Sequence, residues 1–356
     1  MSHAFANQNS KGPPERAGDN AAPDQPLRPG MLWIPGGTFL MGSDKHYPEE
    51  APAHKVSVGG FWMDRHTVTN RDFRLFVEAT GYRTLAERPA NEADYPGALP
   101  DLLLPSSVVF KKAGNRVDLR DPYNWWTYVA GADWRHPRGP QSSIEGLEDH
   151  PVVHVAFEDA QAYAAWIGKE LPTEAEWEFA ACGGLAAAEF VWGDEYMPDG
   201  KPMANTWQGE FPWQNLLEDG YEWTAPVCTF PPNGYGLYEM AGNVWEWTTD
   251  WYQDHKLIER SCCTLDNPRG AKREASIDPR TPKILIPRKV MKGGSYLCAP
   301  NYCRRYRPAA RMPQQIDTSI CHLGFRCISR PRTSERPKEE ISAMRIVAPV
   351  IDTRLT

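Results

Sequence analysis

The sequence predicts one irregular, loop-rich domain of mixed α/β (α+β) class with little regular secondary structure. The 356 residues include 28 Gly and 33 Pro, which favour turns, and 14 Trp, whose large rings can fill a core that has few helices and strands. Short strand patterns alternate with three short helical ones. Tryptophans occur from Trp33 to Trp251 without a clear linker between them, so we expect one domain rather than two.

The first ordered elements are expected to be two strands. Residues 31–34 are apolar, residues 35–37 are the turn signal Pro-Gly-Gly, and residues 38–41 continue as a second strand pattern. Because so short a turn commonly joins two antiparallel strands, we expect a β-hairpin at the edge of a small sheet.

Three segments carry helix signals. In two of them a Thr is followed three residues later by an acidic side chain, Asp72 after Thr69 and Glu176 after Thr173, which is the pattern of a capping box. In the third, residues 158–167, apolar side chains recur at i, i+3, i+4 and i+7. We expect a helix directly after each Thr and another over residues 158–167.

Polar segments flank and interrupt the domain. Residues 1–29 hold five prolines and few large apolar side chains, so we expect a disordered N-terminal tail. Residues 254–288 are rich in Pro, Arg and Asp and are expected to form a surface insertion. Residues 331–356 are charged and are expected to form a loosely attached C-terminal tail. The domain itself is therefore expected over residues 30–330.

Composition also excludes several classes of protein. The net charge of −7 argues against a nucleic-acid partner. No apolar run approaches the roughly 20 residues that a membrane helix needs, so we expect no membrane partner. Residues 1–11 lack the hydrophobic stretch of a secretory signal. We therefore expect a cytoplasmic protein, in which the eight cysteines stay reduced.

The strongest chemical signal is the thiol pair Cys298 and Cys303. Pro300 and Asn301 between them favour a turn that brings the two sulfurs together. Positive charge favours thiolates over thiols, and four arginines follow the pair: Arg304, Arg305, Arg307 and Arg311. Two thiolates suit copper(I), which accepts a low coordination number. A pair of ordinary buried thiols is the alternative.

Two other groups of metal-ligand residues give weaker signals. Cys321 and Cys327 could join the thiol pair in a four-thiolate zinc site, although the gaps of four and five residues are wider than in most zinc motifs. His150 and His154 have the spacing of metal ligands on a helix. The β-branched residues between these histidines favour a strand instead, where the rings would lie about 13 Å apart. We expect both histidines to be structural.

Residues 233–247 combine glycine turns with closely spaced oxygen donors. Glu239 and Glu246, with the backbone carbonyls between them, could hold a hard cation such as calcium. The alternative is a glycine-shaped loop with two solvated glutamates. The residue types alone leave both open.

Several segments together resemble one known family. They are IPGGTFLMG at 34–42, LPTEAEWE at 171–178, GNVWEW at 242–247, GGSY at 293–296 and LGFR at 323–326. The chain is similar, over about residues 31–330, to the bacterial type of formylglycine-generating enzymes, also called sulfatase-modifying factors. Two longer segments separate this family from non-oxidising relatives: GGSYLCAPNYC at 293–303 and ANTWQGEFP at 204–212.

The resemblance implies a fold, an activity and partners. The fold would be the loop-rich one of the sulfatase-modifying factors, which is related to C-type lectins. The activity would be oxidation of the cysteine in a Cys-x-Pro-x-Arg motif to Cα-formylglycine, using molecular oxygen and a thiol reductant, which activates type I sulfatases. The substrate would be an unfolded sulfatase polypeptide, bound extended in a groove lined by aromatics such as Trp125 and Trp126.

The resemblance also implies site residues. Cys298 and Cys303 match the pair that binds copper(I), while Ser295 and Trp245 match active-site positions, as a polar positioning group and a wall of the oxygen pocket. Two calcium sites are implied, with backbone carbonyls from Thr206, Tyr221, Gly242 and Val244. The first would use Asn205, Thr206, Asp219 and Tyr221, and the second Glu239, Gly242, Val244 and Glu246. Glu239 stands where the family has an asparagine.

Departures from the family pattern bear on compartment and function. Ala164, Ala181 and Pro308 stand where secreted relatives have disulfide cysteines, which agrees with a bacterial, cytoplasmic protein. Two other functions stay open. One is a non-catalytic lectin-like binding module with a structural thiol or zinc loop. The other is a histidine–iron sulfoxide synthase, which is weakened because Ala156 takes the place of the acidic residue in its His-x3-His-x-Glu motif.

Overall fold

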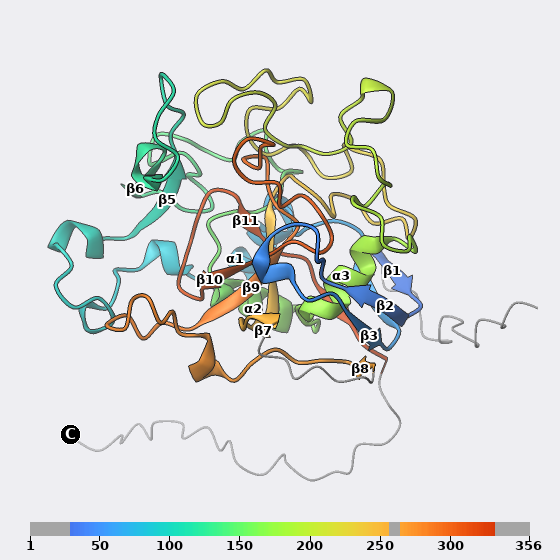
Figure 1. Cartoon of the computed structure of the whole chain (residues 1–356). Helices are drawn as coiled ribbons and strands as arrows, with labels where there is room; N and C mark the ends of the chain where they lie inside the picture. The colour runs from blue at the N-terminus through green and yellow to red at the C-terminus, as the bar shows by residue number, and fades with distance from the viewer. Residues whose placement is uncertain (1–28, 256–263, 332–356) are drawn as a thin grey trace, which may run out of the picture.

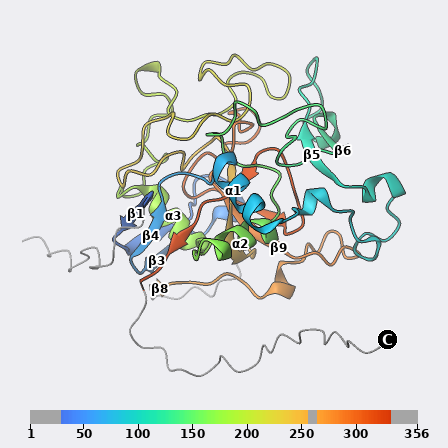
Figure 2. The same ribbon diagram turned by 180° about the vertical axis from the view of Figure 1, so that it is seen from behind.

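In the part of the chain that the structure describes, three short α-helices and four small β-sheets are joined by long irregular segments. The structure is a computed structural model that describes residues 29–255 and 264–331 (Figure 1). Loops make up much of this part, and the view from behind shows the same arrangement (Figure 2). The predicted loop-rich, mixed α/β class is confirmed.

The sheets are short and mostly antiparallel. The central sheet has the order β10-β9-β7-β11 and contains β7 (Trp245–Trp251), β9 (Arg288–Lys292), β10 (Arg311–Gln315) and β11 (Leu323–Gly324). A second, β1-β4-β12, contains β1 (Met31–Ile34), β4 (Phe61–Asp64) and β12 (Ile328–Ser329). A third, β2-β3-β8, contains β2 (Gly37–Met41), β3 (His54–Val58) and β8 (Leu265–Asp266). The fourth pairs β5 (Ser106–Phe110) with β6 (Trp126–Ala130), on the side of the molecule opposite β1 and β3 (Figures 1 and 2).

All three predicted helices are confirmed. They are α1 (Asn70–Thr80), α2 (Phe157–Trp166) and α3 (Glu174–Cys182). The two capping boxes form as expected, because the hydroxyls of Thr69 and Thr173 accept from the amides of Asp72 and Glu176. Short 3₁₀ turns complete the list: η1 (Pro48–Glu50), η2 (Leu85–Glu87), η3 (Glu92–Asp94), η4 (Pro100–Leu103), η5 (Pro122–Asn124), η6 (Pro198–Gly200) and η8 (Arg273–Ser276).

The predicted hairpin over residues 31–41 is wrong. Both strands form, but β1 pairs with β4 and β2 pairs with β3. At Gly36, where φ is 72°, a Cβ atom would lie 2.6 Å from the carbonyl oxygen of Val58. The Pro-Gly-Gly turn therefore packs tightly against the end of β3 and carries the chain from one sheet into the next.

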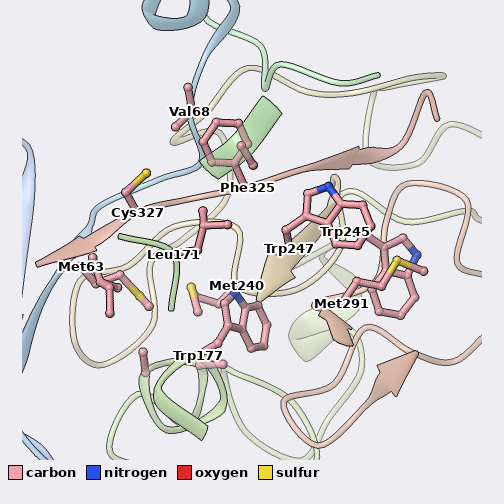
Figure 3. Packing of buried hydrophobic residues seen from close by; sticks show 14 of the residues in the cluster. Met63, Val68, Leu171, Trp177, Met240, Trp245, Trp247, Met291, Phe325 and Cys327 are labelled. Atoms are coloured by element: carbon pink, nitrogen blue, oxygen red, sulfur yellow. The ribbon is translucent and has the colours of Figure 1, made fainter. Parts of the chain in front are cut away.

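Buried aromatic rings fill the core, as the tryptophan count predicts. Trp177, Trp245 and Trp247 lie in the main cluster, where Met240 and Met291 pack between them (Figure 3). Their polar atoms are used as well, since Trp177 donates to a carboxylate oxygen of Glu246 at 2.9 Å and Trp247 to the carbonyl of Val155 at 3.0 Å. A second cluster packs beside the first, around Phe110, Trp125, Trp207, Phe211 and Tyr296.

His150 and His154 do not lie on a strand. A single bridge between Pro151 and Thr69 is the sole pairing described between residues 150 and 155, and His154 has a φ of 60°. Both histidines are nevertheless structural, as predicted. The His150 ring hydrogen-bonds to Thr224, and the buried His154 ring to the Ser107 hydroxyl and the Pro137 carbonyl.

Several predicted segments lie wholly or largely outside the described residues. These are the N-terminal tail up to residue 28, residues 256–263 with Cys262 and Cys263, and the C-terminal tail from residue 332. In the described remainder of the expected insertion, β8 pairs in parallel with β3. Within residues 29–255 and 264–331, no helix is both long enough and apolar enough to cross a membrane.

Candidate active site

Cys298 and Cys303 lie in a tight loop that follows β9. The loop opens at Gly294, where φ is 73°. A Cβ atom there would lie 2.8 Å from the carbonyl oxygen of Arg305, so glycine allows the loop to close on itself. The amide of Cys303 then donates to the carbonyl of Ala299 at 2.8 Å, which turns the chain back.

The two sulfur atoms are 3.2 Å apart. A disulfide bond has a length of about 2.05 Å, and both residues are free thiols. The prediction that a turn through residues 300 and 301 brings the sulfurs together is confirmed. Cys298 is 2% exposed and Cys303 8%, so Cys303 is the more accessible of the two. At this separation one soft metal ion can contact both sulfurs, so this donor set fits copper(I).

The two thiols differ in acidity. Burial raises the pKa of Cys298, which keeps its proton. The hydrogen bond from Cys298, together with the nearby Arg305 charge, lowers the pKa of Cys303 despite its burial. Arg305 Nη1 lies 3.8 Å from the Cys303 sulfur, while Arg305 Nη2 lies 2.5 Å from Glu49 Oε1 and the guanidinium covers the Tyr47 ring at 3.8 Å. The arrangement favours a thiolate on Cys303.

Of the four arginines expected to favour thiolates, Arg305 alone contacts one of the paired sulfurs within the described ranges. The other three pair with glutamates: Arg304 with Glu189, Arg307 with Glu50, and Arg311 with Glu174. The last two pairs are buried and connect the segment after the cysteines to η1 and α3. These arginines therefore fix the chain next to the thiols.

Ser295 lies directly beside the thiol pair. Its amide donates to the Cys298 sulfur at 3.4 Å, and its Oγ lies 3.0 Å from Nδ1 of His322. Trp245 is 2% exposed in the same core cluster, and its amide donates to the carbonyl of His322 at 2.8 Å. Sequence reasoning missed His322, because it is distant in the sequence and no local motif points to it.

Aromatic side chains surround the loop. Tyr302, which is 38% exposed, stacks on Phe211 with ring centroids 4.5 Å apart. Trp125 packs edge-on against Tyr302, with ring centroids 5.4 Å apart, but is 1% exposed. It therefore packs against the loop from the core and does not line an open groove. Trp126 is half-buried, and its ring lies 5.0 Å from that of His322.

The first set of predicted calcium ligands forms one cluster. Asp219 accepts from the Thr206 amide at 3.0 Å and from the Tyr221 amide at 3.0 Å, and burial raises its pKa. Asn205 is fully buried, and its Nδ2 donates to the carbonyl of Trp223. Its Oδ1 has no hydrogen-bond partner among the described residues. A buried amide oxygen without a partner, next in sequence to the residue whose amide donates to the Asp219 carboxylate, fits a ligand of a hard cation.

The second set does not fit a calcium ion. Both carboxylate oxygens of Glu246 are bound by Arg326 at 2.7 Å, and one also accepts from Trp177. Glu239 accepts from three consecutive backbone amides, those of residues 228–230. Gly242 and Val244 lie between them, buried against the core. The alternative of two solvated glutamates is wrong, because Glu239 is 6% exposed and Glu246 fully buried.

The four-thiolate zinc site is not formed. Cys321 accepts from the Phe110 amide and the Tyr296 hydroxyl, and Cys327 lies near Met63 and Val68 (Figure 3). Within the described ranges, no three His, Cys, Asp or Glu side chains come together in a way that could hold a metal ion. The cysteine site is thus a pair.

Comparison with known proteins identifies the family. Residues 17–331 match the sulfatase-modifying factor enzyme 1-like domain. The chain belongs to this family. It is 50% identical over 304 residues to a formylglycine-generating enzyme of Mycobacterium tuberculosis, covering 85% of this chain and 98% of that one. It is also 39% identical over 320 residues to the mouse protein named inactive C-alpha-formylglycine-generating enzyme 2, covering 88% and 89%.

A solved structure supports the fold of this family member. PvdO from Pseudomonas aeruginosa aligns with a TM-score of 0.57 at 24% identity, covering 85% of this chain and 94% of that one. At this identity the likeness concerns the fold alone. Since the family includes a relative named as inactive, the activity of this member has to be argued from its own thiol pair.

Proposed function

We propose that this protein converts the cysteine of a Cys-x-Pro-x-Arg sulfatase motif into Cα-formylglycine, as a copper-dependent oxidase, and so activates type I sulfatases. The observation that carries the proposal is the reduced pair Cys298 and Cys303, with sulfurs 3.2 Å apart. Relatives named formylglycine-generating enzymes, of which one is 50% identical, support the substrate class.

The two cysteines would hold copper(I), which supplies the one-electron chemistry with oxygen that thiols alone lack. Arg305 stabilises the Cys303 thiolate, and the Ser295 amide hydrogen-bonds to the Cys298 sulfur. Burial shields Cys298 from solvent, while Cys303 keeps a small exposure. In the overall reaction one oxygen atom enters the aldehyde and the other becomes water, while a thiol reductant supplies two electrons and the substrate sulfur leaves as sulfide.

The substrate would reach the pair from the Cys303 side, where the adjacent Tyr302 is 38% exposed. An extended, unfolded segment suits this approach, because a folded client would keep its cysteine buried. The binding-module alternative is not favoured, since the Cys321 sulfur accepts hydrogen bonds elsewhere, Cys327 packs in the core, and no group of three metal-binding side chains forms within the described residues.

The test uses the purified protein, loaded with copper(I), a thiol reductant, air and a synthetic Cys-x-Pro-x-Arg peptide. We expect an aldehyde in place of the peptide thiol by mass spectrometry, and about one copper per chain by metal analysis. Cys298→Ser and Cys303→Ser should keep the circular dichroism spectrum but lose both copper and turnover. Turnover by either copper-loaded variant at the wild-type rate would overturn the mechanism.

We also propose one structural calcium ion, held by the Asn205 and Asp219 side chains with the carbonyls of Thr206 and Tyr221. The unpaired Oδ1 of Asn205 supports it, because a buried acceptor without a partner destabilises the fold. The second predicted site is not proposed, because Arg326 already neutralises Glu246.

A further inference from the structure

Two histidine side chains from distant parts of the chain lie against each other. His54 is the first residue of β3, and His255 follows β7. Their ring centroids are 5.0 Å apart, with the ring planes at 85°. His255 is 3% exposed, and His54 is half-buried. Neither side chain takes part in the proposed oxidation, so this contact points to a separate role.

Both rings are held through the same nitrogen. His54 Nδ1 lies 2.9 Å from the carbonyl oxygen of Pro52, and His255 Nδ1 lies 3.1 Å from that of Glu50. A carbonyl only accepts hydrogen bonds, so Nδ1 carries the proton and the lone pair of each neutral ring is left on Nε2. Within residues 29–255 and 264–331, neither Nε2 atom forms a hydrogen bond. Metal-bound histidines share this arrangement, since their second nitrogen usually donates to a carbonyl or a carboxylate.

The two rings line one cavity of about 180 Å³. A water molecule occupies roughly 30 Å³, so an ion with bound water fits into this space. Four charged side chains also line the cavity: Glu174, Asp250, Arg269 and Arg311. The Glu174 carboxylate binds the Arg311 guanidinium at 2.6 and 2.8 Å, so these two charges compensate each other.

Asp250 supplies further negative charge to the cavity. Its Oδ2 accepts a hydrogen bond from the Glu174 amide at 2.5 Å. Burial raises the pKa of Asp250 to about 7, although the Arg269 charge acts in the opposite direction. A cation bound in the cavity would therefore favour the ionised form of this carboxylate.

We propose that His54 and His255 bind one divalent transition-metal ion such as zinc through their Nε2 atoms, with water completing the shell. An ion about 2.0 Å from Nε2 lies about 3.2 Å from the ring centroid. Two rings with centroids 5.0 Å apart then meet at the ion with an angle of about 100°, close to the tetrahedral geometry of zinc. Imidazole suits zinc and the thiol pair suits copper(I), so the two sites take different ions. The inference does not depend on the proposed function.

The test uses Zn²⁺ and the full chain with Cys298→Ser and Cys303→Ser, which removes the thiol pair. Titration calorimetry in excess calcium should show one bound zinc ion per chain. His54→Gln and His255→Gln in this parent should each weaken zinc binding at least tenfold, with an unchanged circular dichroism spectrum. In the parent itself, zinc should protect His54 from diethylpyrocarbonate, which modifies free imidazole nitrogens, as measured by peptide mapping.

His66 is the matched control. It is half-buried, and its Nδ1 also lies beside a backbone carbonyl, that of Thr67, at 2.8 Å. His66→Gln should bind zinc like the parent, and zinc should leave the modification of His66 unchanged. Absence of zinc binding, an unchanged affinity in His54→Gln and His255→Gln, or equal protection of His54 and His66 would overturn the inference. A thiolate-to-metal charge-transfer band with Co²⁺ would also overturn it, because the ligands would then be cysteines.

Discussion

Ser295 and His322 hydrogen-bond to each other across 27 positions of sequence, with Oγ 3.0 Å from Nδ1. Burial lowers the pKa of His322 to about 3, so its imidazole is neutral near pH 7. The ring is held in place by the edge of Trp126. His322 therefore acts on Ser295 through a directed hydrogen bond and not through a charge, which makes it a positioning residue for the hydroxyl beside Cys298.

Replacing His322 should separate this role from a merely structural one. An Asn side chain can place a polar atom near the position of Nδ1, so His322→Asn should keep most of the wild-type kcat. Leu fills a similar volume but makes no hydrogen bond, and His322→Leu should lower kcat about tenfold with little change in KM. Steady-state kinetics on the motif peptide check both values. Equal kcat values in the two variants would contradict the positioning role.

The contact between Arg305 and Cys303 predicts which thiol reacts first. In the metal-free protein, iodoacetamide near pH 7 should label Cys303 before Cys298, because Cys303 has the lowered pKa and the larger exposure. Arg305→Gln removes a charge that lowers this pKa, so the labelling rate of Cys303 should rise at a higher pH than in the wild type. Peptide mapping by mass spectrometry gives both rates.

The control for this prediction is Arg304→Gln, since Arg304 pairs with Glu189 and makes no contact with either paired sulfur. Its labelling profile should overlay that of the wild type. Preferential labelling of Cys298, or an equal shift in both arginine variants, would show that Arg305 does not set the acidity of Cys303.

The proposed calcium site predicts that two carboxylates differ in their effect on stabilisation by calcium. Calcium should raise the Tm of the wild type, because an ion that binds only the folded state stabilises it. Asp219→Asn should lose most of this shift, since it removes the charged ligand of the first site. Glu239→Gln should keep the calcium-induced rise in Tm, because the Glu239 carboxylate accepts hydrogen bonds from three backbone amides. The reverse pattern would place the ion at the second set of residues.

The sequence predicts features that depend on contacts between residues close together in the chain. The capping boxes at Thr69 and Thr173 and the turn between Cys298 and Cys303 each involve residues within a few positions, and all three form. The strands β1 and β2 were found, but their partners β4 and β3 are chosen by packing across the domain, so the hairpin prediction failed.

The contacts of the candidate active site also include local ones, which the sequence predicts, and long-range ones, which it does not. The thiol pair is visible in one short motif. By contrast, Glu49 reaches Arg305 from 256 positions away, and Tyr95 reaches Asp317 from 222. Nothing in the sequence around Glu49 or Tyr95 specifies these contacts, because they exist only once η1 and the segment around Tyr95 have packed against residues 305–317.

His154 gives a pH dependence of stability with a definite sign. Its ring is fully buried between the Ser107 hydroxyl and the Pro137 carbonyl, and burial lowers its pKa from 6.5 to about 4. On acidification the unfolded chain takes up this proton first, so the folded state loses stability as the pH falls from about 6.5 to about 4.

His154→Gln removes this contribution to the free energy of unfolding, which amounts to about 3 kcal/mol over the window. Urea unfolding of wild type and variant at several pH values measures it. As a control, His66→Gln makes the same exchange at a ring whose hydrogen bond, among the described residues, is with the neighbouring Thr67 carbonyl. Parallel pH profiles for the wild type and His154→Gln would mean that His154 is not buried as a neutral ring.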